Sequence, residues 1–494
     1  MINPNKKLVD LLYRCPLLAV EGQTDRVIHN LNVDSRMSLP NSVFVALRGT
    51  QADGHDHIQQ ALDHGASVIV CERWPEDINR DTLEVTWVLV SDSAKALGWI
   101  AANFYEDPSE ELEVVGVTGT NGKTTVVTLL HQMALDLGMN AGLLSTVIVR
   151  FGDVSWEPKH TTLDAIELHK TLRAMCMDRC THVFMEVSSH ACIQQRIAGV
   201  KFRGGIFTNI THDHLDYHKT FANYLAAKKS FFDGLSSRAF ALTNIDDKNG
   251  LVMTQNTHAK VRSYSLQQPA NYRARVLEYN MDGSLLEWEG KEIWTQLVGR
   301  FNAANVTAVI GAALELGWDE EEVLLSASKL LPADGRFQVL AFEAGFHAVV
   351  DYAHTPDALK SVLETLHDVK SENGKILTVV GCGGNRDVDK RPKMGAIAAE
   401  ASDRLWLTAD NPRFEKADAI IEDMYSGIAL ADQSKVRREK DRETAITEAI
   451  TACHPGDILL VAGKGHETYQ IIDGHTFDFD DRLVLKKAYR NLYP

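Results

Sequence analysis

The sequence predicts an α/β protein of three domains built on mainly parallel sheets. The chain has 494 residues, which is too long for a single hydrophobic core. Along most of its length, short apolar runs alternate with polar loops and helical patterns, as in doubly wound sheets. Polar, chemically distinctive loops directly follow several of these runs, and parallel sheets bind ligands at the carboxyl ends of their strands. We expect domains at 1–108, 109–337 and 338–494.

Composition indicates a soluble globular protein. Charged residues make up 24% and hydrophobic residues 45% of the chain. The formal charge of −16 disfavours nonspecific binding to nucleic acid or anionic membranes, so we expect neither as a partner. No run approaches the ~20 apolar residues of a membrane span, and the N-terminus lacks a secretion signal. The seven scattered cysteines suit free thiols in a reducing cytoplasm.

The elements follow in order. In the first domain, strand-like runs cover 42–47, 67–71 and 87–90, with a helical pattern at 57–64 and a polar linker at 108–112. In the second, a strand at 113–117 precedes a glycine loop and a helix at 123–137, and strands follow at 182–187 and 204–209. After a linker at 331–335, the third domain has strands at 347–351, 375–380, 404–408 and 457–462.

The glycine loop GVTGTNGKTT, residues 116–125, has the context of a phosphate-binding loop. The common GxxxxGK[ST] spacing requires glycine at 117, where Val117 stands. Gly119 and Gly122 would let backbone N–H groups approach phosphate oxygens, while Lys123 would contact the β- and γ-phosphates. The alternative is a tight strand-to-helix turn with an exposed lysine. The combination of residue types between a strand and a helix favours nucleotide binding.

A Mg²⁺ ion bound by the Thr124 hydroxyl needs further ligands. Glu186 ends a buried strand pattern and His214 follows another, so both are candidates. The nearby His212 and His218 are expected to make capping and turn hydrogen bonds. The histidine spacing also permits a transition-metal site, but carboxylate, hydroxyl and phosphate oxygens favour Mg²⁺.

The order of the motifs resembles the Mur ligase family of peptidoglycan synthesis. The motifs are GVTGTNGKTT, MEVSSH, TNITHDHLDYH, YLAAKKSFF, GRFNAAN, DGRFQ and DYAHTPDAL. The resemblance covers nearly the whole chain, and the family's phosphate loop is TGTNGKT, so the position of Gly119 matches its pattern. It implies a central P-loop ATPase-type parallel sheet, flanked by an N-terminal uridine-nucleotide-binding α/β domain and a C-terminal Rossmann-like domain.

The resemblance also implies a catalytic and nucleotide-binding set. Lys228 matches the family's carbamylated lysine, and CO₂ adds only to a neutral amine, so its site must favour that form. The alternative is an ordinary surface lysine, which is what we expect of Lys229. The implied catalytic residues are Lys123, Lys228, His214 and Glu186, and the implied Mg²⁺ ligands are Thr124, Glu186, His214 and Lys228. The implied ATP contacts are Gly119, Thr120, Asn121, Gly122, Lys123, Thr124, Thr125, Asn305, Arg336 and Asp351.

Two residues of these motifs have structural alternatives. Asn302 could serve only as a helix cap. His354 could lie against the nucleotide or make a hydrogen bond that stabilises its own loop.

The outer motifs imply the other substrates. Segments at 33–36 and 49–54 resemble uridine-nucleotide contacts, and the implied UDP-muramoyl-dipeptide residues are Val33, Ser35, Thr50, Gln51, Ala52, Thr161, Thr162, Ser188, Gln194 and Arg196. The DNPR motif resembles that of ligases selecting meso-diaminopimelate, where Arg413 could pair with the distal carboxylate through two hydrogen bonds. The implied diaminopimelate residues are Arg386, Asp410, Asn411, Pro412, Arg413, Gly463 and Glu467.

The expected activity is ATP-dependent addition of meso-diaminopimelate to UDP-N-acetylmuramoyl-L-alanyl-D-glutamate, through an acyl phosphate, by a cytoplasmic monomer. One alternative is a relative that adds lysine or lanthionine instead. Folate-polyglutamate ligases share the central architecture but lack a comparable uridine-binding domain. A noncatalytic nucleotide switch would leave the DNPR and GKGHE motifs unexplained.

Overall fold

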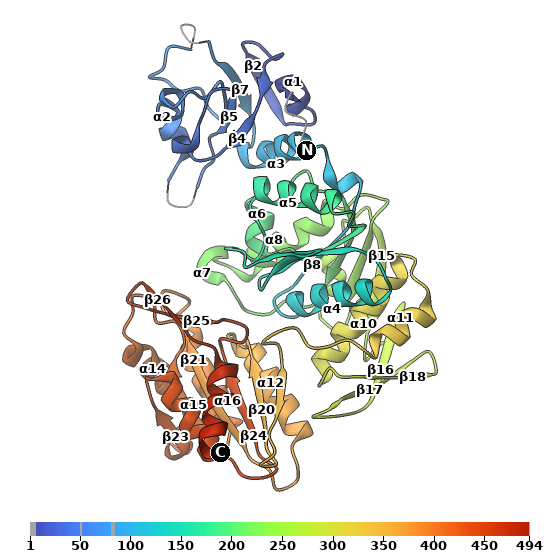
Figure 1. The fold of residues 1–494 in the computed structure, drawn as a ribbon, viewed down its shortest axis with the longest axis vertical. Coiled ribbons are helices and arrows are strands. Elements are labelled where there is room, and N and C mark those ends of the chain that lie inside the picture. The colour runs from blue at the N-terminus through green and yellow to red at the C-terminus, as the bar shows by residue number, and fades with distance from the viewer. Residues whose placement is uncertain (1–5, 50–51, 81–83, 494) are drawn as a thin grey trace.

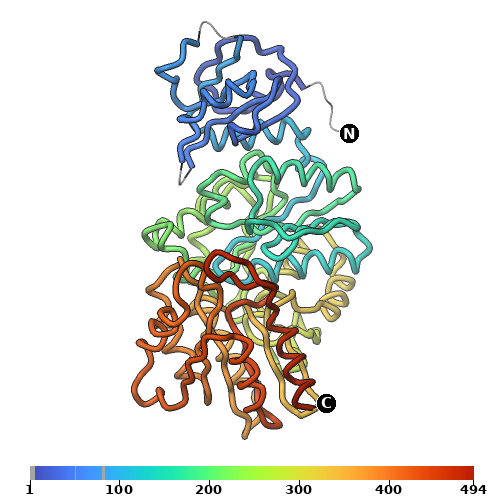
Figure 2. The backbone as a smooth tube through the Cα atoms, turned by 60° about the vertical axis from the view of Figure 1, so that its left-hand side comes forward, coloured from blue at the N-terminus to red at the C-terminus, as the bar shows by residue number. Residues whose placement is uncertain are grey.

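The computed structural model of the chain describes residues 6–49, 52–80 and 84–493. Three α/β domains follow one another along the long axis, with the N-terminal domain at one end and the C-terminal domain at the other (Figure 1). The turned view in Figure 2 shows the same order. Each domain has its own sheet, so the predicted fold class is confirmed. Thr50 and Gln51 lie outside the described residues.

The N-terminal sheet has the strand order β2-β7-β6-β5-β4, in which only β2 is antiparallel to its neighbour. β5 and β6 are entirely buried, as expected for strands covered on both faces. The strands are β2 (Leu17–Glu21), β4 (Asn30–Asn32), β5 (Ser42–Val45), β6 (Val68–Cys71) and β7 (Thr86–Val90), with a small pair β1 (Lys6–Lys7) and β3 (Val27–Ile28). The helices are α1 (Leu8–Leu11), α2 (Ile58–Asp63) and α3 (Ser93–Phe104).

The central sheet has eleven strands in the order β11-β10-β9-β12-β8-β13-β14-β15-β16-β17-β18. It is parallel from β9 to β16, whereas β10–β11 and β16–β18 are antiparallel extensions that the sequence did not indicate. The strands are β8 (Glu113–Thr118), β9 (Ala141–Leu144), β10 (Val149–Phe151), β11 (Val154–Trp156), β12 (His182–Glu186), β13 (Phe202–Phe207), β14 (Phe240–Asn244), β15 (Lys260–Ser265), β16 (Tyr272–Asn280), β17 (Gly283–Trp288) and β18 (Lys291–Thr295).

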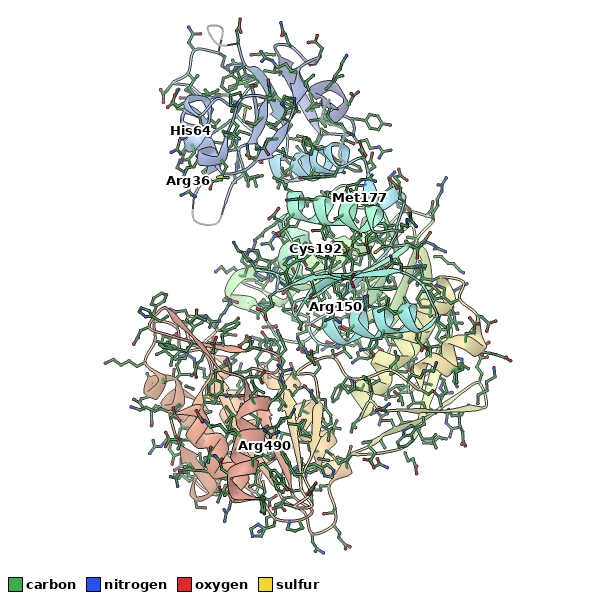
Figure 3. The ribbon with its side chains drawn as sticks, viewed as in Figure 1. Arg36, His64, Arg150, Met177, Cys192 and Arg490 are labelled. Atoms are coloured by element: carbon green, nitrogen blue, oxygen red, sulfur yellow. The ribbon has the colours of Figure 1, made fainter. Side chains whose placement is uncertain are left out.

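Helices cover both faces of the central sheet and form two separate hydrophobic cores. α4 and α10 pack on one face, and α5 and α8 on the other. The helices are α4 (Lys123–Asp136), α5 (Ala165–Met177), α6 (Ser189–Ile193), α7 (Leu215–His218), α8 (Phe221–Asp233), α9 (Gly250–Met253), α10 (Arg300–Glu315) and α11 (Glu320–Ala327). The seven cysteines all lie among the described residues and are free, with Cys192 inside this domain (Figure 3).

The C-terminal sheet has the order β19-β20-β24-β21-β22-β23 and is parallel except for β19. The strands are β19 (Gln338–Ala341), β20 (His347–Asp351), β21 (Ile376–Cys382), β22 (Arg404–Ala409), β23 (Val436–Arg438) and β24 (Ile458–Ala462), followed by the hairpin β25 (Tyr469–Ile472) and β26 (His475–Asp478). The helices are α12 (Pro356–Val369), α13 (Lys390–Glu400), α14 (Ala417–Ser426), α15 (Arg442–Thr451) and α16 (Asp481–Leu492). Of the helices in the described ranges, none is long and apolar enough to cross a membrane.

The N-terminal and central domains are tightly packed where α3 meets α5. Gly98 of α3 lies so close to the central domain that an added Cβ would be 2.5 Å from the Ala198 Cβ. In segment 108–112, predicted to be a linker, Pro108–Glu110 form a short 3₁₀ turn. Ser109 in this turn is buried and its Oγ accepts a hydrogen bond from the Lys201 N–H at 3.0 Å. The two domains therefore form one packed unit.

We predict that Gly98→Ala lowers the melting temperature. In a free helix this change is stabilising by roughly 0.5–1 kcal/mol. Here the new methyl group would overlap Ala198, and overpacking of this kind costs about 1–3 kcal/mol. Thermal unfolding followed by calorimetry measures the shift. Lys95→Ala, on the exposed face of the same helix, is the control and should change little. A melting temperature of Gly98→Ala at or above that of the parent would contradict the packing argument.

Candidate active site

A cleft of about 920 Å³ lies between the central and C-terminal domains. Much of its lining comes from the loops at the carboxyl ends of both parallel sheets, as the sequence pattern predicts, and the rest includes residues of α8, α10 and α12. The phosphate loop, residues 120–125, lies on the central side, and the DNPR and GKGHE segments lie on the other. Side chains on two domains therefore face one shared cavity.

The structure of the phosphate loop explains why Val117 stands where the common GxxxxGK[ST] spacing requires glycine. Val117 is still within β8, where it is fully buried and pairs in register with Glu186 and Ile206. The turn begins two residues later at Gly119, where an added Cβ would overlap the Thr208 hydroxyl. Gly122 has φ +86° and would place a Cβ 2.6 Å from the Asn305 side-chain oxygen. Both glycines are thus required by the loop itself.

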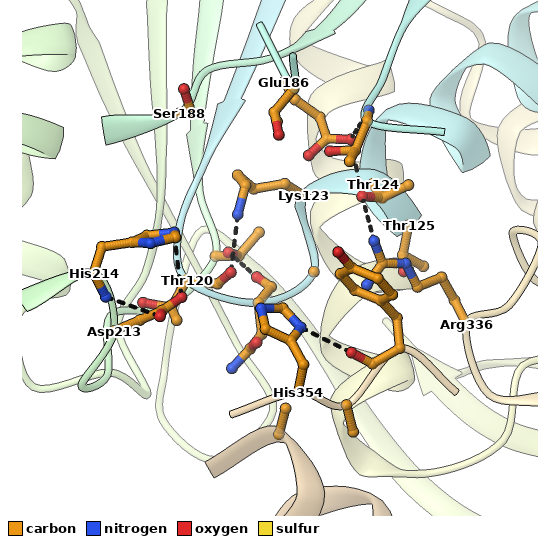
Figure 4. Close-up of a pocket in the computed structure, with 18 of the residues that line it drawn as sticks. Thr120, Lys123, Thr124, Thr125, Glu186, Ser188, Asp213, His214, Arg336 and His354 are labelled. Carbon is orange, nitrogen blue, oxygen red and sulfur yellow. Dashed lines mark hydrogen bonds and ion pairs between the residues drawn. The ribbon is translucent and has the colours of Figure 1, made fainter. Parts of the chain in front are cut away.

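Lys123 begins α4 and folds back over the loop. Its ammonium donates to the carbonyl oxygens of Gly119 and Thr120, both at 2.9 Å (Figure 4). Burial lowers the pKa of Lys123, while the nearby carboxylates of Glu186 and Asp213 oppose this shift. A phosphate in the loop would offer this ammonium a negatively charged partner in place of two neutral carbonyls.

Thr124 and Glu186 form the predicted hydroxyl–carboxylate pair. The Thr124 Oγ1 donates to Glu186 Oε1 at 2.8 Å, and the Thr146 N–H donates to the same oxygen at 2.7 Å. The second oxygen, Oε2, is buried and has no hydrogen-bond partner among the described residues. A buried carboxylate oxygen without a partner beside a threonine hydroxyl fits a Mg²⁺ ion, which binds oxygen ligands. The residues present therefore suit this metal.

His214 and Lys228 lie on the other side of the loop. His214 has φ +53°, and its Nε2 is 3.4 Å from Asp213 Oδ2. Figure 4 shows this pair across Lys123 from Glu186. Among the described residues no three His, Cys, Asp or Glu side chains gather into a metal cluster. A metal held here would therefore also need hydroxyl, phosphate or water oxygens.

Lys228 is buried in α8 rather than exposed, so the surface-lysine alternative is wrong. Its ammonium nitrogen donates to the Gly119 carbonyl at 2.7 Å. Burial, reinforced by the charge of Lys123, lowers the pKa of Lys228 well below its ordinary value. Its neighbour Lys229 makes an (i, i+4) ion pair with Asp233 at 2.6 Å. The site of Lys228 thus favours the neutral amine that carbamylation requires.

His218, His354 and Asn302 make hydrogen bonds within the protein, but His354 also lines the cleft, so its contact with a nucleotide stays a prediction. His218 hydrogen-bonds the Ser189 hydroxyl at 2.9 Å, and His354 Nδ1 bonds the Tyr352 carbonyl at 2.9 Å. Gly299 caps α10, so the interpretation of Asn302 as a cap is wrong. Instead, Asn302 lies in the first turn, donates to the Val298 carbonyl at 3.0 Å and accepts from Asn305 at 3.2 Å. This contact fixes the side chain of Asn305 at the cleft.

Arg336 touches both domains. Its Nη2 donates to the Thr124 hydroxyl at 3.0 Å, and its guanidinium lies 4.4 Å from the centre of the Tyr352 ring (Figure 4). The preceding Gly335 has φ +63°, and an added Cβ would overlap the backbone of His466. Asp351, at the end of β20, accepts the Phe337 N–H at 2.6 Å and so holds the chain just after Arg336. Burial raises the pKa of Asp351, and Arg336 opposes this shift.

The residues expected to bind the muramoyl dipeptide and the uridine lie in two places. Thr161, Ser188 and Arg196 line the cleft. Thr162 and Gln194 support them, because Thr162 Oγ1 accepts the Ser188 N–H at 3.1 Å and Gln194 Oε1 accepts from the Arg196 Nε–H at 2.9 Å. The other described candidates belong to the N-terminal domain and lie outside the lining of this cleft, namely Val33, Ser35 and Ala52.

The residues expected to bind diaminopimelate are brought together, because Arg386, Asp410, Asn411, Arg413, Gly463 and Glu467 all line the cleft. Pro412 is buried, and its carbonyl packs so closely on Gly384 that an added Cβ there would overlap it. Arg413 has φ +56° and its Nη1 donates to the Gly384 carbonyl at 2.7 Å. Its backbone N–H donates to Ile471 of the β25–β26 hairpin at 2.9 Å. The β25–β26 hairpin therefore holds the Arg413 backbone, and the Gly384 carbonyl holds its guanidinium.

Sequence reasoning missed Lys464 in GKGHE. This lysine is fully buried, with its ammonium 3.1 Å from Glu467 Oε2 and 3.8 Å from Asp410 Oδ1. Asn411 also donates to Glu467 Oε2, at 2.7 Å. Burial and the charge of Asp410 raise the pKa of Glu467, whereas Lys464 opposes the shift. A charged residue flanked by two glycines after a buried strand was the available signal. Sequence reasoning also missed Asp213, which lies beside His214, and Lys390. The Lys390 ammonium donates to the His354 carbonyl at 2.8 Å.

Comparisons with known proteins identify the family. The chain matches the Mur ligase family catalytic domain over residues 27–105, the Mur ligase middle domain over 117–313, and the Mur ligase glutamate ligase domain over 335–465. These matches, together with the relatives described below, show that the chain belongs to the Mur ligase family.

Relatives resemble the chain over its full length. A protein of Cytophaga hutchinsonii named UDP-N-acetylmuramoyl-L-alanyl-D-glutamate--2,6-diaminopimelate ligase is 50% identical over 481 residues, covering 97% of this chain and 98% of its own. A protein of the same name from Phocaeicola vulgatus is 49% identical, covering 98% of this chain and 100% of its own. A solved structure of a ligase of that name superposes with a TM-score of 0.70 at 30% identity, covering 99% of this chain and 100% of its own.

We predict that Lys464→Met destabilises the protein in a pH-dependent way. Without the ammonium, Asp410 and Glu467 would be buried together with no cation between them, which costs about 3–5 kcal/mol in free energy of unfolding. The pKa of Glu467, already above its ordinary 4.5, would rise further. The folded state would then retain a proton that the unfolded state releases, so the deficit relative to the parent should grow as pH rises from 4.5 to 7.

Denaturant unfolding at several pH values measures this deficit. Lys487→Met is the matched control, because Lys487 forms an ion pair with Glu443 at the protein surface. Surface ion pairs contribute about 0–1 kcal/mol, so Lys487→Met should change the free energy of unfolding very little at any pH. A deficit for Lys464→Met that stays constant over this pH range would count against the proposed charge balance.

Proposed function

We propose that this chain is the ADP-forming ligase that joins meso-diaminopimelate to UDP-N-acetylmuramoyl-L-alanyl-D-glutamate. The names of the relatives support this assignment. The observation that carries it is the composition of one cleft. A phosphate loop with Lys123 and Glu186 faces, across the same cavity, a pair of arginines and a pair of carboxylates suited to a zwitterionic amino-acid head.

In the proposed first step, the side-chain carboxylate of D-glutamate attacks the γ-phosphorus of ATP, and the bond to the departing ADP breaks. This step brings negative charges together, so neutralisation is the main requirement. Lys123 and the backbone N–H groups of the loop would neutralise that charge. Mg²⁺ bound by Thr124 and Glu186, with His214 and a carbamylated Lys228 as further ligands, would supply additional positive charge to the phosphates.

In the second step, the neutral amine of diaminopimelate attacks the acyl-phosphate carbonyl carbon. Phosphate leaves, an amide bond forms, and the amine releases a proton to solvent. Arg413 and Arg386 would bind the distal carboxylate, while Glu467 and Asp410 would accept hydrogen bonds from the distal ammonium. Asn305, Arg336 and Asp351 would position the nucleotide. Because the acyl phosphate is hydrolysable, closure of the two domains around the cleft would also protect it from water.

The remaining substrate would span the first two domains. We propose that the uridine end contacts Val33, Ser35 and the 50–52 segment, and that Thr161, Ser188 and Arg196 hold the muramoyl dipeptide. Because the cleft is lined by one chain, we propose that the enzyme works as a monomer. We also propose a cytoplasmic location, because ATP and UDP-sugars are cytoplasmic substrates.

The deciding experiment measures ADP release with ATP, Mg²⁺ and the UDP-muramoyl dipeptide. Separate reactions receive meso-, LL- or DD-diaminopimelate, lysine, lanthionine or no amino acid. We expect turnover that requires the dipeptide and is fastest with the meso isomer. Hydrolysis indifferent to the dipeptide would indicate a nucleotide switch, and preference for lysine or lanthionine would move the assignment to another ligase.

We predict that Lys123→Ala reduces kcat for ADP release by roughly 10²- to 10³-fold, the usual cost of losing one group that stabilises developing charge. Steady-state assays with all three substrates measure the loss. Lys291→Ala, an exposed lysine on β18, should retain parental turnover. Near-parental activity of the Lys123 variant would remove the phosphate loop from the mechanism.

We predict that Arg413→Ala raises the KM for meso-diaminopimelate about 10- to 100-fold, because a hydrogen bond to a charged group contributes about 1.5–3 kcal/mol. The KM for ATP should change less than twofold, since Arg413 contacts the other side of the cleft. Arg437→Ala, a surface arginine paired with Glu448, serves as the control. An unchanged amino-acid KM would refute the role given to the DNPR motif.

A further inference from the structure

A buried ion pair lies beneath the amino-acid side of the cleft. Arg442 and Asp481 are both 0% exposed and form a two-pronged contact, with Nε to Oδ1 at 2.8 Å and Nη2 to Oδ2 at 2.7 Å. Arg442 is the first residue of α15 and Asp481 the first of α16. The pair therefore ties together the beginnings of two helices that are distant in sequence.

The same guanidinium also binds the ends of two strands. Its Nη2 donates to the Ala462 carbonyl at 3.1 Å, and its Nη1 donates to the Ala409 carbonyl at 3.4 Å. These residues end β24 and β22, which are not neighbours, because β21 lies between them. Arg442 thus bridges two strand ends across an intervening strand.

Each bridged carbonyl directly precedes a segment of the amino-acid site. Asp410 follows Ala409, and the GKGHE segment from Gly463 to Glu467 follows Ala462. The planar fork of arginine presents its N–H groups on separate nitrogens in a fixed geometry, whereas the donors of a lysine ammonium all lie on one nitrogen at the end of a flexible chain. Asp481 is the direct ion-pair partner of Arg442, and the carboxylates of Asp410 and Glu467 also interact with its charge. Arg442→Lys keeps this charge and removes the fork, so it separates the effect of geometry from the effect of charge.

Stability alone does not account for such a pair. Buried ion pairs are often no more stabilising than apolar residues of similar volume, so their presence is weak evidence for a stabilising role. What apolar residues cannot supply is directional donation to both strand-end carbonyls.

We propose that Arg442, oriented by Asp481, is a positioning residue for diaminopimelate binding, which fixes the spacing between Asp410 and Glu467. This inference rests on the proposed function. It concerns a residue that contacts no substrate and lies outside the lining of the cleft.

The test compares Arg442→Met, Arg442→Lys and Asp481→Asn with Ile446→Ala. Ile446 is fully buried one turn further along α15, so its truncation loosens the same helix while the hydrogen bonds of Arg442 to both strand ends remain. For each variant we would measure the melting temperature, kcat, the KM values for meso-diaminopimelate and ATP, and diaminopimelate affinity by calorimetry in the presence of the UDP-muramoyl dipeptide and a nonhydrolysable ATP analogue.

We expect Arg442→Met to raise the KM for diaminopimelate roughly 10- to 100-fold, as displacement of binding groups by about 1 Å can do. The KM for ATP should stay within about twofold of the parental value. Arg442→Lys and Asp481→Asn should show smaller losses of the same kind. Ile446→Ala should lower the melting temperature without this selective change in KM.

Equal shifts in both KM values, or an Ile446→Ala profile matching that of Arg442→Met, would overturn the proposal. If Arg442→Met does not fold, Arg442→Lys decides, and parental diaminopimelate affinity in that variant would be decisive against it. Absence of diaminopimelate-dependent turnover in the unaltered protein would contradict the proposed function and this inference together. If the unaltered protein shows diaminopimelate-dependent turnover, the proposed function holds, and the results for the variants then test only the role of Arg442.

Discussion

The two halves of the proposed chemistry lie on different domains, and Arg336 is a point at which both domains meet in the cleft. Its guanidinium lies over Tyr352 of the C-terminal domain and donates to Thr124 of the phosphate loop. Gly335, just before it, packs on the segment that contains Glu467. Rotation of the C-terminal domain must therefore remake contacts at this junction. The same few residues therefore contact the phosphate loop, the segment that contains Glu467 and the junction between the two domains.

The backbone carbonyl of Gly119 contacts two lysines, Lys123 and Lys228, for which different roles are proposed. The Gly119 oxygen accepts from Lys123 at 2.9 Å and from Lys228 at 2.7 Å. Two ammonium groups on one neutral acceptor repel each other, and the more deeply buried amine is held toward its neutral form. The Gly119 carbonyl thus brings the charge of Lys123 close to Lys228, which favours the neutral amine that the predicted carbamylation requires. Glycine at 119 permits this arrangement because no side chain separates the loop from Thr208.

Local patterns predicted the parallel strands and their polar loops, because burial on both faces gives each strand a continuous apolar run. They also placed the DNPR and GKGHE segments directly after strands, which the structure confirms, whereas their grouping in one amino-acid site came from the family resemblance. The antiparallel extension β16–β18 was not predicted, since its exposed faces break the apolar pattern. Lys464 and Arg442 were missed for a different reason. Their partners are fixed by the sheet order and by contacts between distant residues, such as the 39-residue separation of Arg442 and Asp481.

The close contact at Gly98 has a consequence for substrate choice. Because α3 packs directly on the central domain there, the separation between the N-terminal domain and the phosphate loop is set by rigid packing. If uridine is held by the N-terminal domain, as proposed, the distance from the bound uridine to the phosphate loop is fixed. A nucleotide-linked peptide one residue shorter would leave its carboxylate short of the γ-phosphate, and one residue longer would carry it past. The enzyme would then select its nucleotide substrate by the length of the peptide as well as by its chemical identity.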